Sequence, residues 1–335
     1  MRIVVFGQAV IHGPVDWSAG VREAAAGADA AICNFEGCLP PDGAWPMKRK
    51  TVHPAHRDAP SMLADLGVTH LAIANNHAWD FGHAGIVNTR AVAQAAGFAV
   101  AGAGRTLAEA SAPATRNGVA LIAADCGPTP DWAVAGPATP GVNPLRMTRS
   151  LGLPQADLDR MRAIAEQTGE AGLRRLRRAI GYDRPTEREE FYGLAMEAAD
   201  APAEIWRCDE GDFDRLAKGV ATARQAAEKV VVALHYHHWA SDWRRPPEWI
   251  VPLGRRIVEA GADAVVCTGP PFLYDMADHK GAPIAPSLGN LVFHTARGEA
   301  YDRLGHPVWE GGILVIEDEG CSLLRTDVPR LETGA

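Results

Sequence analysis

The sequence carries two clusters of side chains whose types and spacing could do chemistry. The first is ANNHAWDFG, residues 74–82, in which two carboxamides, an imidazole and a carboxylate follow the apolar run THLAIA. The second is HYHHW, in which His235 and His237 alternate around Tyr236 and would share one face of a strand. Two imidazoles on one face suit either one metal ion or paired proton transfers in one pocket.

Turn chemistry is the alternative explanation of the first cluster. Asparagine accommodates left-handed backbone and caps helices, and Asp80 with Gly82 could begin the next helix. Other polar side chains also follow apolar runs, however: Gln8 follows RIVVFG, and Glu36 follows DAAICNF. Ligands of layered α/β domains gather at the carboxyl ends of strands, so we expect these side chains to meet in one cleft.

Strand and helix signals alternate over the first 125 residues, which predicts a layered α/β domain. A Pro- and Gly-rich loop follows at 127–144, and residues of about 155–228 have a charged, helical pattern. We interpret this second segment as a helical insertion or lid that covers or flanks the cleft. Strand signals return at 229–239 and 262–271, so residues 1–330 are predicted to form a single domain of two packed sheets with helices outside.

The composition excludes several classes of protein. The 335 residues are 47% hydrophobic with a net charge of −8, which is typical of a globular chain and argues against nucleic-acid binding. The basic run GLRRLRR, 172–178, is interpreted as a solvated helix face. Six cysteines without a CxxC pair suit reduced thiols in a cytoplasmic protein. The sequence has neither a span-length apolar run nor a leader pattern, so no membrane association is expected.

Several segments together resemble the CapA family, the poly-γ-glutamate capsule-synthesis proteins, which are similar to calcineurin-like metallophosphoesterases. NFEG resembles the family's N-L-E segment, and ANNHAWDFGHAGIVNT resembles its A-N-N-H-x-x-D-x-G signature. PGVNPLR and GAPIAPSLGNLVF match further segments in the same order. The resemblance implies a four-layer α/β/β/α metallophosphoesterase-like sandwich, interrupted by the helical insertion, with the active site between the sheets.

The same resemblance implies roles for individual residues. Asn76 and His235 would ligate a metal, and Glu36 would bridge two metals. His77 would act beside them as an acid or a transition-state donor, and Asp80 would orient His77.

Three positions depart from the family pattern. Gln8 replaces an aspartate, and Thr268 and Pro271 in TGPP stand where the family has histidines. An amide is a weak ligand and proline offers no side-chain donor, so we expect no dinuclear centre. Our expectation is no metal and no cofactor; a single divalent metal ion, held by Glu36, Asn76 and His235, is the alternative.

Three functions remain open. The favoured one is metal-independent acid/base epimerisation at a peptide Cα, because a site that lacks these metal ligands resembles the peptide epimerases of this superfamily. The alternatives are a one-metal hydrolase of an amide or phosphoester and a non-catalytic binding protein. The substrate would be a peptide or small molecule. The expected catalytic residues are His77, His235, His237, His294 and Glu36, with His294 and His235 as the opposing pair. The expected substrate-binding residues are Gln8, Asn75, Asn76, Asp80, Trp79 and Trp239.

Overall fold

The computed structural model describes residues 1–49, 51–183 and 188–330. The chain divides into two compact units. The main unit comprises residues 1–146 and 210–335, and the inserted unit comprises residues 147–209. All side chains of the predicted site belong to the main unit.

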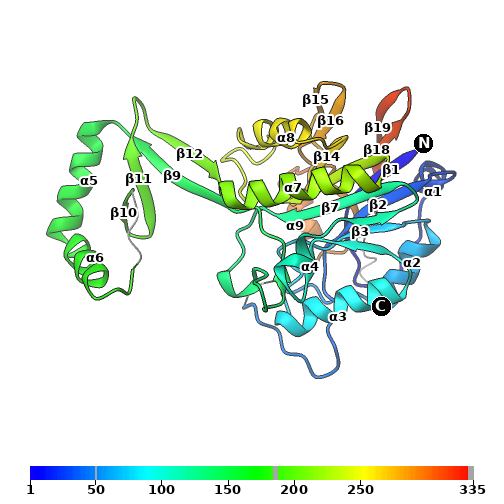
Figure 1. The fold of residues 1–335 in the computed structure, drawn as a ribbon, viewed down its shortest axis with the longest axis horizontal. Helices are drawn as coiled ribbons and strands as arrows, with labels where there is room; N and C mark the ends of the chain where they lie inside the picture. Colours follow the sequence, from blue (N-terminus) through cyan, green and yellow to red (C-terminus); the bar gives the residue numbers. More distant parts are fainter. Residues whose placement is uncertain (50, 184–187, 331–335) are drawn as a thin grey trace. The chain divides into compact units, whose positions relative to one another are not determined.

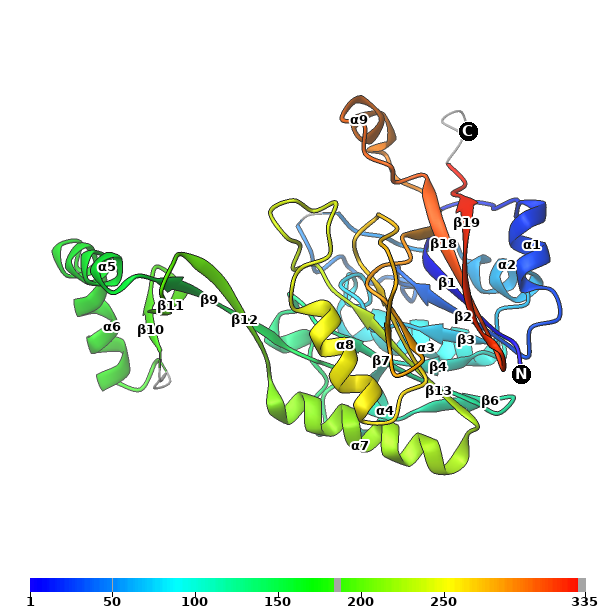
Figure 2. The same ribbon diagram turned by 90° about the horizontal axis from the view of Figure 1, so that it is seen from above.

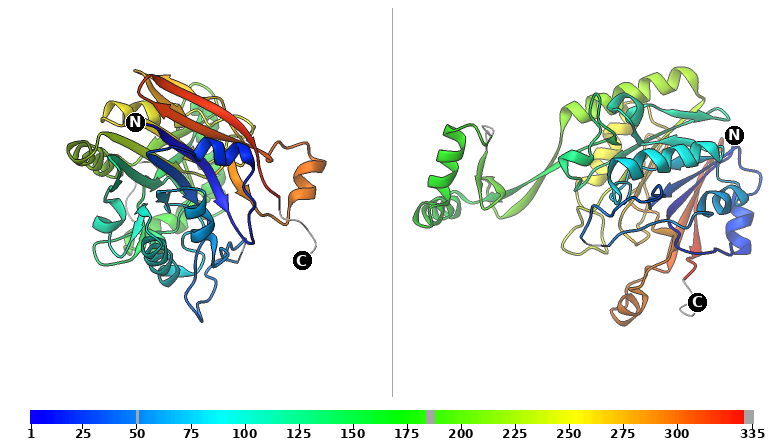
Figure 3. Two further views of the ribbon diagram at one scale, coloured as in Figure 1. Left: turned by 90° about the vertical axis from the view of Figure 1, so that its right-hand side faces the viewer. Right: turned by 90° about the horizontal axis from the view of Figure 1, so that it is seen from below.

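Seven strands of the described residues form the first sheet of the main unit (Figure 1). Its centre is β1 (Ile3–Val10), which pairs in parallel with β2 (Ala30–Phe35) and β17 (Asn290–Phe293). Figure 3 shows β1, in blue, beside the orange to red C-terminal strands, with which it pairs antiparallel through β18. The other strands are β3 (His70–Ala72), β4 (Ala99–Ala101), β18 (Glu310–Glu317) and β19 (Gly320–Asp327).

The second sheet has six strands within the described residues. Its centre is β13 (Lys229–His235), which pairs in parallel with β7 (Val119–Asp125) and β14 (Ala264–Thr268). The outer strands are β6 (Ala114–Arg116), β15 (Ala277–His279) and β16 (Ala282–Ala285). A short separate ladder pairs β5 (Ala103–Gly104) with β8 (Gly141–Val142).

Helices cover the outer faces of both sheets. The long helices α7 (Glu210–Ala226) and α8 (Ile250–Glu259) pack on the second sheet (Figure 2). The first sheet is covered by α1 (Ala19–Ala25), α2 (Ala59–Asp65) and α3 (Gly82–Ala95). The remaining helices are α4 (Leu107–Ser111), the 3-10 helix η1 (Asp131–Ala133) and α9 (Gly298–Arg303). The main unit therefore has the α/β/β/α architecture that the resemblance implied.

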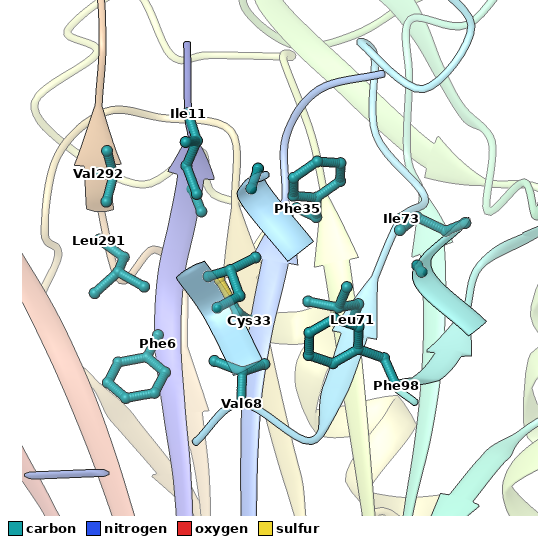
Figure 4. Close-up of a cluster of buried hydrophobic side chains, with 14 of the residues drawn as sticks. Phe6, Ile11, Cys33, Phe35, Val68, Leu71, Ile73, Phe98, Leu291 and Val292 are labelled. Atoms are coloured by element: carbon teal, nitrogen blue, oxygen red, sulfur yellow. The ribbon is translucent and has the colours of Figure 1, made fainter. Parts of the chain in front are cut away.

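Because side chains alternate along a strand, β1 contributes to two apolar cores, one on each face of its sheet. Val4 and Phe6 point toward the helices, whereas Ile3 and Val5 join the apolar layer between the two sheets. Figure 4 shows Phe6 in the helix-side cluster together with Cys33 and Leu71 of the neighbouring strands. Because both faces of the sheet are buried, its strands read as continuous apolar runs and their polar residues are left to the strand ends.

The inserted unit combines two helices with a four-stranded sheet. The prediction of helix throughout 155–228 is wrong over 189–208, where strands form. Phe191 pairs with Leu194 across a two-residue turn in which Tyr192 has φ 54° and Gly193 φ 73°, the geometry of a tight hairpin. The elements are β9 (Met147–Leu153), α5 (Gln155–Gln167), α6 (Glu170–Ala179), β10 (Glu189–Phe191), β11 (Leu194–Ala198) and β12 (Ala203–Cys208).

The boundaries of the insertion also differ from the prediction. It begins at residue 147 rather than about 155, and α7 belongs to the main unit. The charged composition of α7 suggested a solvated insertion, but Leu216, Val220 and Ala223 form a buried stripe on this helix. In the part of the chain that the structure describes, no helix is long and apolar enough to span a bilayer.

Candidate active site

A cavity of about 400 Å³ lies at the carboxyl ends of the central strands of the main unit. Glu36 follows β2, Asn76 and His77 follow β3, and His237 follows β13. Parallel strands bring their carboxyl ends to one edge, so residues distant in sequence meet there. The wall consists of Gln8, Glu36, Lys48, Arg49, Thr51, His53, Asn76, His77, Trp79, His237, Trp239, Gly269, Pro271, Phe293, Arg297 and Tyr301.

The Glu36 carboxylate lies at the centre of a cluster of imidazoles. Its Oε1 atom is 3.9 Å from Nε2 of each of three histidines, His77, His235 and His237. Glu36 is 5% exposed, and burial opposes its ionisation, but the neighbouring imidazoles outweigh burial and lower the pKa of the carboxyl to about 2. Among the described residues, Glu36 Oε2 and His237 Nε2 are buried without a hydrogen-bond partner.

The His235 ring joins the two sheets. Its Nε2 lies 2.9 Å from Oδ1 of Asn76, and its Nδ1 lies 3.0 Å from the hydroxyl of Thr268. An amide oxygen only accepts, so Nε2 carries the proton and Nδ1 accepts from the hydroxyl. Burial lowers the pKa of His235 to about 3, which keeps the ring neutral. His235 thus holds the Asn76 side chain in place from behind the cavity wall.

His77 is oriented by Asp80, as the resemblance implied. Nδ1 of His77 donates to Oδ2 of Asp80 at 2.8 Å, and the same oxygen accepts the backbone N–H of His53 at 2.7 Å. The other oxygen of Asp80 pairs with Lys48 at 2.8 Å. Although burial opposes ionisation of Asp80, these bonds outweigh it and lower its pKa. The arrangement leaves Nε2 of His77 directed to the Glu36 side of the cavity.

Gln8 serves as a cross-link rather than as a free ligand. Its Nε2 donates to Oδ1 of Asn290, and its Oε1 accepts the backbone N–H of Gly269, each at 2.8 Å. The pairing of β1 with its two parallel neighbours, β2 and β17, is irregular beside this residue. Gly269 has φ 117°, and a Cβ there would lie 1.9 Å from the Tyr236 carbonyl oxygen, so only glycine fits this turn.

These residues fit one cation better than two. The ligand atoms of Glu36, His235 and His237 lie within 4.8 Å of one another, but both ring nitrogens of His235 are hydrogen-bonded, so the carboxylate of Glu36 and the imidazole of His237 are the free donors for a single divalent ion. A second ion would need the positions of Gln8 and Pro271, but the Gln8 amide is held by Asn290 and Gly269, and proline has no side-chain donor. The residues present therefore do not fit a dinuclear centre.

The other predicted residues have varied positions. Asn75 is fully buried and uses its amide to bind the Phe35 carbonyl and the backbone N–H of His77. Trp79 and Trp239 lie on the cavity wall. His294 is buried after β17, and its Nδ1 accepts the backbone N–H of His12. Neither His235 nor His294 is on the wall, and their role as an opposing pair stays a prediction.

Sequence reasoning missed a group of wall residues that comes from irregular segments. Lys48, Arg49, Thr51 and His53 lie in the connection between β2 and α2, and Arg297 immediately precedes α9. The available signal was the basic run KRK at 48–50 in an otherwise acidic chain, next to a proline and far from any periodic pattern. His53 also stacks edge-on against His77, with ring centroids 4.1 Å apart.

Comparison with known proteins gives one family and several relatives. The family model described as bacterial capsule synthesis protein PGA_cap matches residues 6–295. The uncharacterized protein y4sH of Sinorhizobium fredii is 28% identical over 70% of this chain and 51% of its own length. The "Probable polyglutamine synthesis accessory protein MT0602" of Mycobacterium tuberculosis is 33% identical over 38% of this chain and 37% of its own. The chain therefore spans about half or less of the curated relatives it matches.

Proposed function

Since the chain belongs to the bacterial capsule synthesis protein PGA_cap family, we propose that its cavity is the active site of a hydrolase that works with a single divalent cation. The observation that supports this most is the pair of buried, unpartnered atoms Glu36 Oε2 and His237 Nε2, described above. A cation held by Glu36 and His237 would give both atoms the partner that they lack, while His235 stays bonded to Asn76 and Thr268.

The side chains around the cavity would have different roles in hydrolysis. A divalent cation bound there would polarise the scissile bond and favour ionisation of a water molecule. His77 is placed to accept a proton from the attacking water and to return it to the leaving group, because Asp80 holds its Nδ1–H and leaves Nε2 toward the cavity. Asn76 and His235 keep the opposite side of the site fixed through their hydrogen bond.

The bond cleaved is an amide or a phosphoester. A relative named for polyglutamine synthesis favours a peptide-like polymer or its precursor as the physiological substrate. The cationic groups on the wall are equally compatible with a phosphoester.

Epimerisation at a peptide Cα without a metal is the second candidate. It is favoured by the loss of donors at Gln8, Thr268 and Pro271 and by the indole side chains of Trp79 and Trp239 on the wall. One group would remove the Cα proton and a second would deliver a proton to the opposite face of the enolate, so that the peptide gains and loses one proton. His77 and His237 are the imidazoles on the wall with ring nitrogens nearest Glu36.

Activity with and without chelator separates the two candidates. Metal-free protein is incubated with bis(p-nitrophenyl) phosphate and with glutamyl p-nitroanilide, in EDTA and then with Mn²⁺, Zn²⁺ or Mg²⁺. The hydrolase predicts release of p-nitrophenol or p-nitroaniline only with a divalent ion. A parallel incubation of short Trp-containing peptides in D₂O with EDTA is followed by NMR. Deuterium at Cα with inversion, and no hydrolysis in any condition, would replace the hydrolase by the epimerase.

A further inference from the structure

Lys48 is a fixed positive charge on the cavity wall. Its side chain is 13% exposed, and its Nζ pairs with Oδ1 of Asp80 at 2.8 Å and donates to the backbone carbonyl of Asn76. Nζ also lies 4.1 Å from the ring centroid of Trp79. The ammonium group has three protons, of which the Asn76 carbonyl accepts one, while Asp80 pairs with the ammonium by charge; protons are thus left for a ligand.

The wall around Lys48 is suited to an anion. Its charged side chains in the described residues are three cations, Lys48, Arg49 and Arg297, and one carboxylate, Glu36, although the whole chain has a net charge of −8. Arg297 is held toward Thr51 by a hydrogen bond between its Nη2 and the threonine hydroxyl.

Two indole groups add further donors to the same wall. Trp79 and Trp239 both line the cavity, and their buried Nε1–H groups have no hydrogen-bond partner among the described residues. An indole N–H can only donate, so each of these two groups lacks an acceptor within the described residues. The cations on the wall are the groups that recognise a phosphate or a carboxylate.

We infer that Lys48 contacts an anionic oxygen of the substrate and supplies the second positive charge of the active site, with Arg297 holding the same anionic group. The inference rests on the proposed function, because a two-ion site uses two cations to neutralise the oxygens of the reacting group, and these residues fit only one ion. The charge of a lysine does not depend on metal ligands. Lys48 therefore supplies a second positive charge in a site where Gln8 and Pro271 cannot hold a second ion. Its pairing with the buried Asp80 fixes the ammonium before the substrate binds.

Binding of inorganic phosphate tests the inference without any turnover. Isothermal titration is performed on EDTA-treated and Mn²⁺-loaded protein for the wild type, Lys48→Gln and Lys48→Arg. Lys48→Gln should weaken phosphate binding about ten- to a hundredfold in both states, because a charge-assisted hydrogen bond is lost. Lys48→Arg should retain most of the affinity. The matched control is Lys280→Gln, an exposed lysine paired with Glu259, which should bind phosphate like the wild type.

A double variant separates ligand binding from a structural role. Lys48→Gln leaves Asp80 buried without its cation, so thermal melting is recorded, and Lys48→Gln/Asp80→Asn removes the unpaired charge. The double variant should regain stability but not phosphate affinity. Recovery of wild-type affinity in the double variant, or wild-type affinity in Lys48→Gln itself, overturns the inference.

Acetate in place of phosphate identifies the class of anion. The anion whose affinity depends more strongly on Lys48 is the one the site recognises. Metal content of the same samples keeps the two proposals apart. Lys48-dependent phosphate binding by protein that takes up no metal would contradict the hydrolase and leave the role of Lys48 intact. Metal uptake with phosphate binding that ignores Lys48 would contradict the role of Lys48 alone.

Discussion

His235 Nε2 lies 2.9 Å from Oδ1 of Asn76, although 159 positions separate the two residues. His235 ends β13 of the second sheet, and Asn76 follows β3 of the first. The bond spans the seam between the sheets at their carboxyl ends, where the cavity opens. It fixes the tautomer of the imidazole and the orientation of the amide together. The geometry of the site therefore depends on how the two sheets pack, and not only on the segment that contains the asparagine.

Replacement of Asn76 by Ala should weaken cation binding. The variant removes the acceptor of the His235 ring and a wall side chain, and loss of such supporting bonds typically costs about 10- to 100-fold in metal affinity. Titration with Mn²⁺ or Zn²⁺ measures the change. Asn117→Ala, a change in an exposed turn, is the control. Equal affinity in Asn76→Ala and the wild type would mean that this amide does not support the site.

Replacement of Gln8 by Ala should destabilise the fold without creating or removing a metal site. It leaves the N–H of Gly269 and the Oδ1 of Asn290 buried and unpaired, at a cost of about 2–4 kcal/mol in the free energy of unfolding. Urea denaturation measures this energy. An unchanged midpoint, or loss of bound metal in the folded variant, would show that Gln8 acts as a ligand and not as a cross-link.

Replacement of Asp80 by Asn should lower turnover more than substrate binding. The carboxylate holds the Nδ1–H of His77, and an amide can present its NH₂ group there and favour the other tautomer. We expect kcat to fall about 10- to 100-fold with a smaller change in KM. Asp58→Asn, at an exposed helix start, serves as the control. A variant with full kcat would show that His77 does not transfer the proton.

Acid should destabilise the protein through His70, which lies in the core far from the chemistry. Burial lowers the pKa of His70 to about 4, below its ordinary value of 6.5, so the unfolded chain binds a proton in this interval and the folded chain does not. The free energy of unfolding should therefore fall as the pH falls from about 6.5 to about 4, by up to about 3 kcal/mol from this residue.

The variant His70→Gln tests whether this residue lowers the free energy of unfolding as the pH falls. Its free energy of unfolding, from urea denaturation at several pH values, should depend less on pH than that of the wild type over this interval. His56→Gln controls for the loss of an imidazole elsewhere. A steeper pH dependence in His70→Gln than in the wild type would contradict the assignment of a neutral buried ring.

The architecture was accessible from sequence because both faces of the sheets are buried. Continuous apolar runs marked the central strands, and their polar ends placed Glu36, Asn76, His77 and His235 at one edge. Lys48 and His53 were not predicted, because they lie in an irregular connection whose path is fixed by Asp80 and Asn76 rather than by a local pattern. The hairpin at Tyr192 and Gly193 was also not predicted, because the charged residues around it suggested a helix.

The number of cations bound per chain decides whether the cavity holds a single divalent ion. Purified protein is stripped with EDTA, equilibrated by dialysis against Mn²⁺ or Zn²⁺, and analysed for bound metal per chain. Glu36→Gln keeps the size of the side chain but removes its charge, and His237→Ala removes the unpartnered nitrogen. We expect one equivalent in the wild type and loss of tight binding in both variants. No bound metal in the folded wild type, or two equivalents, would contradict this expectation.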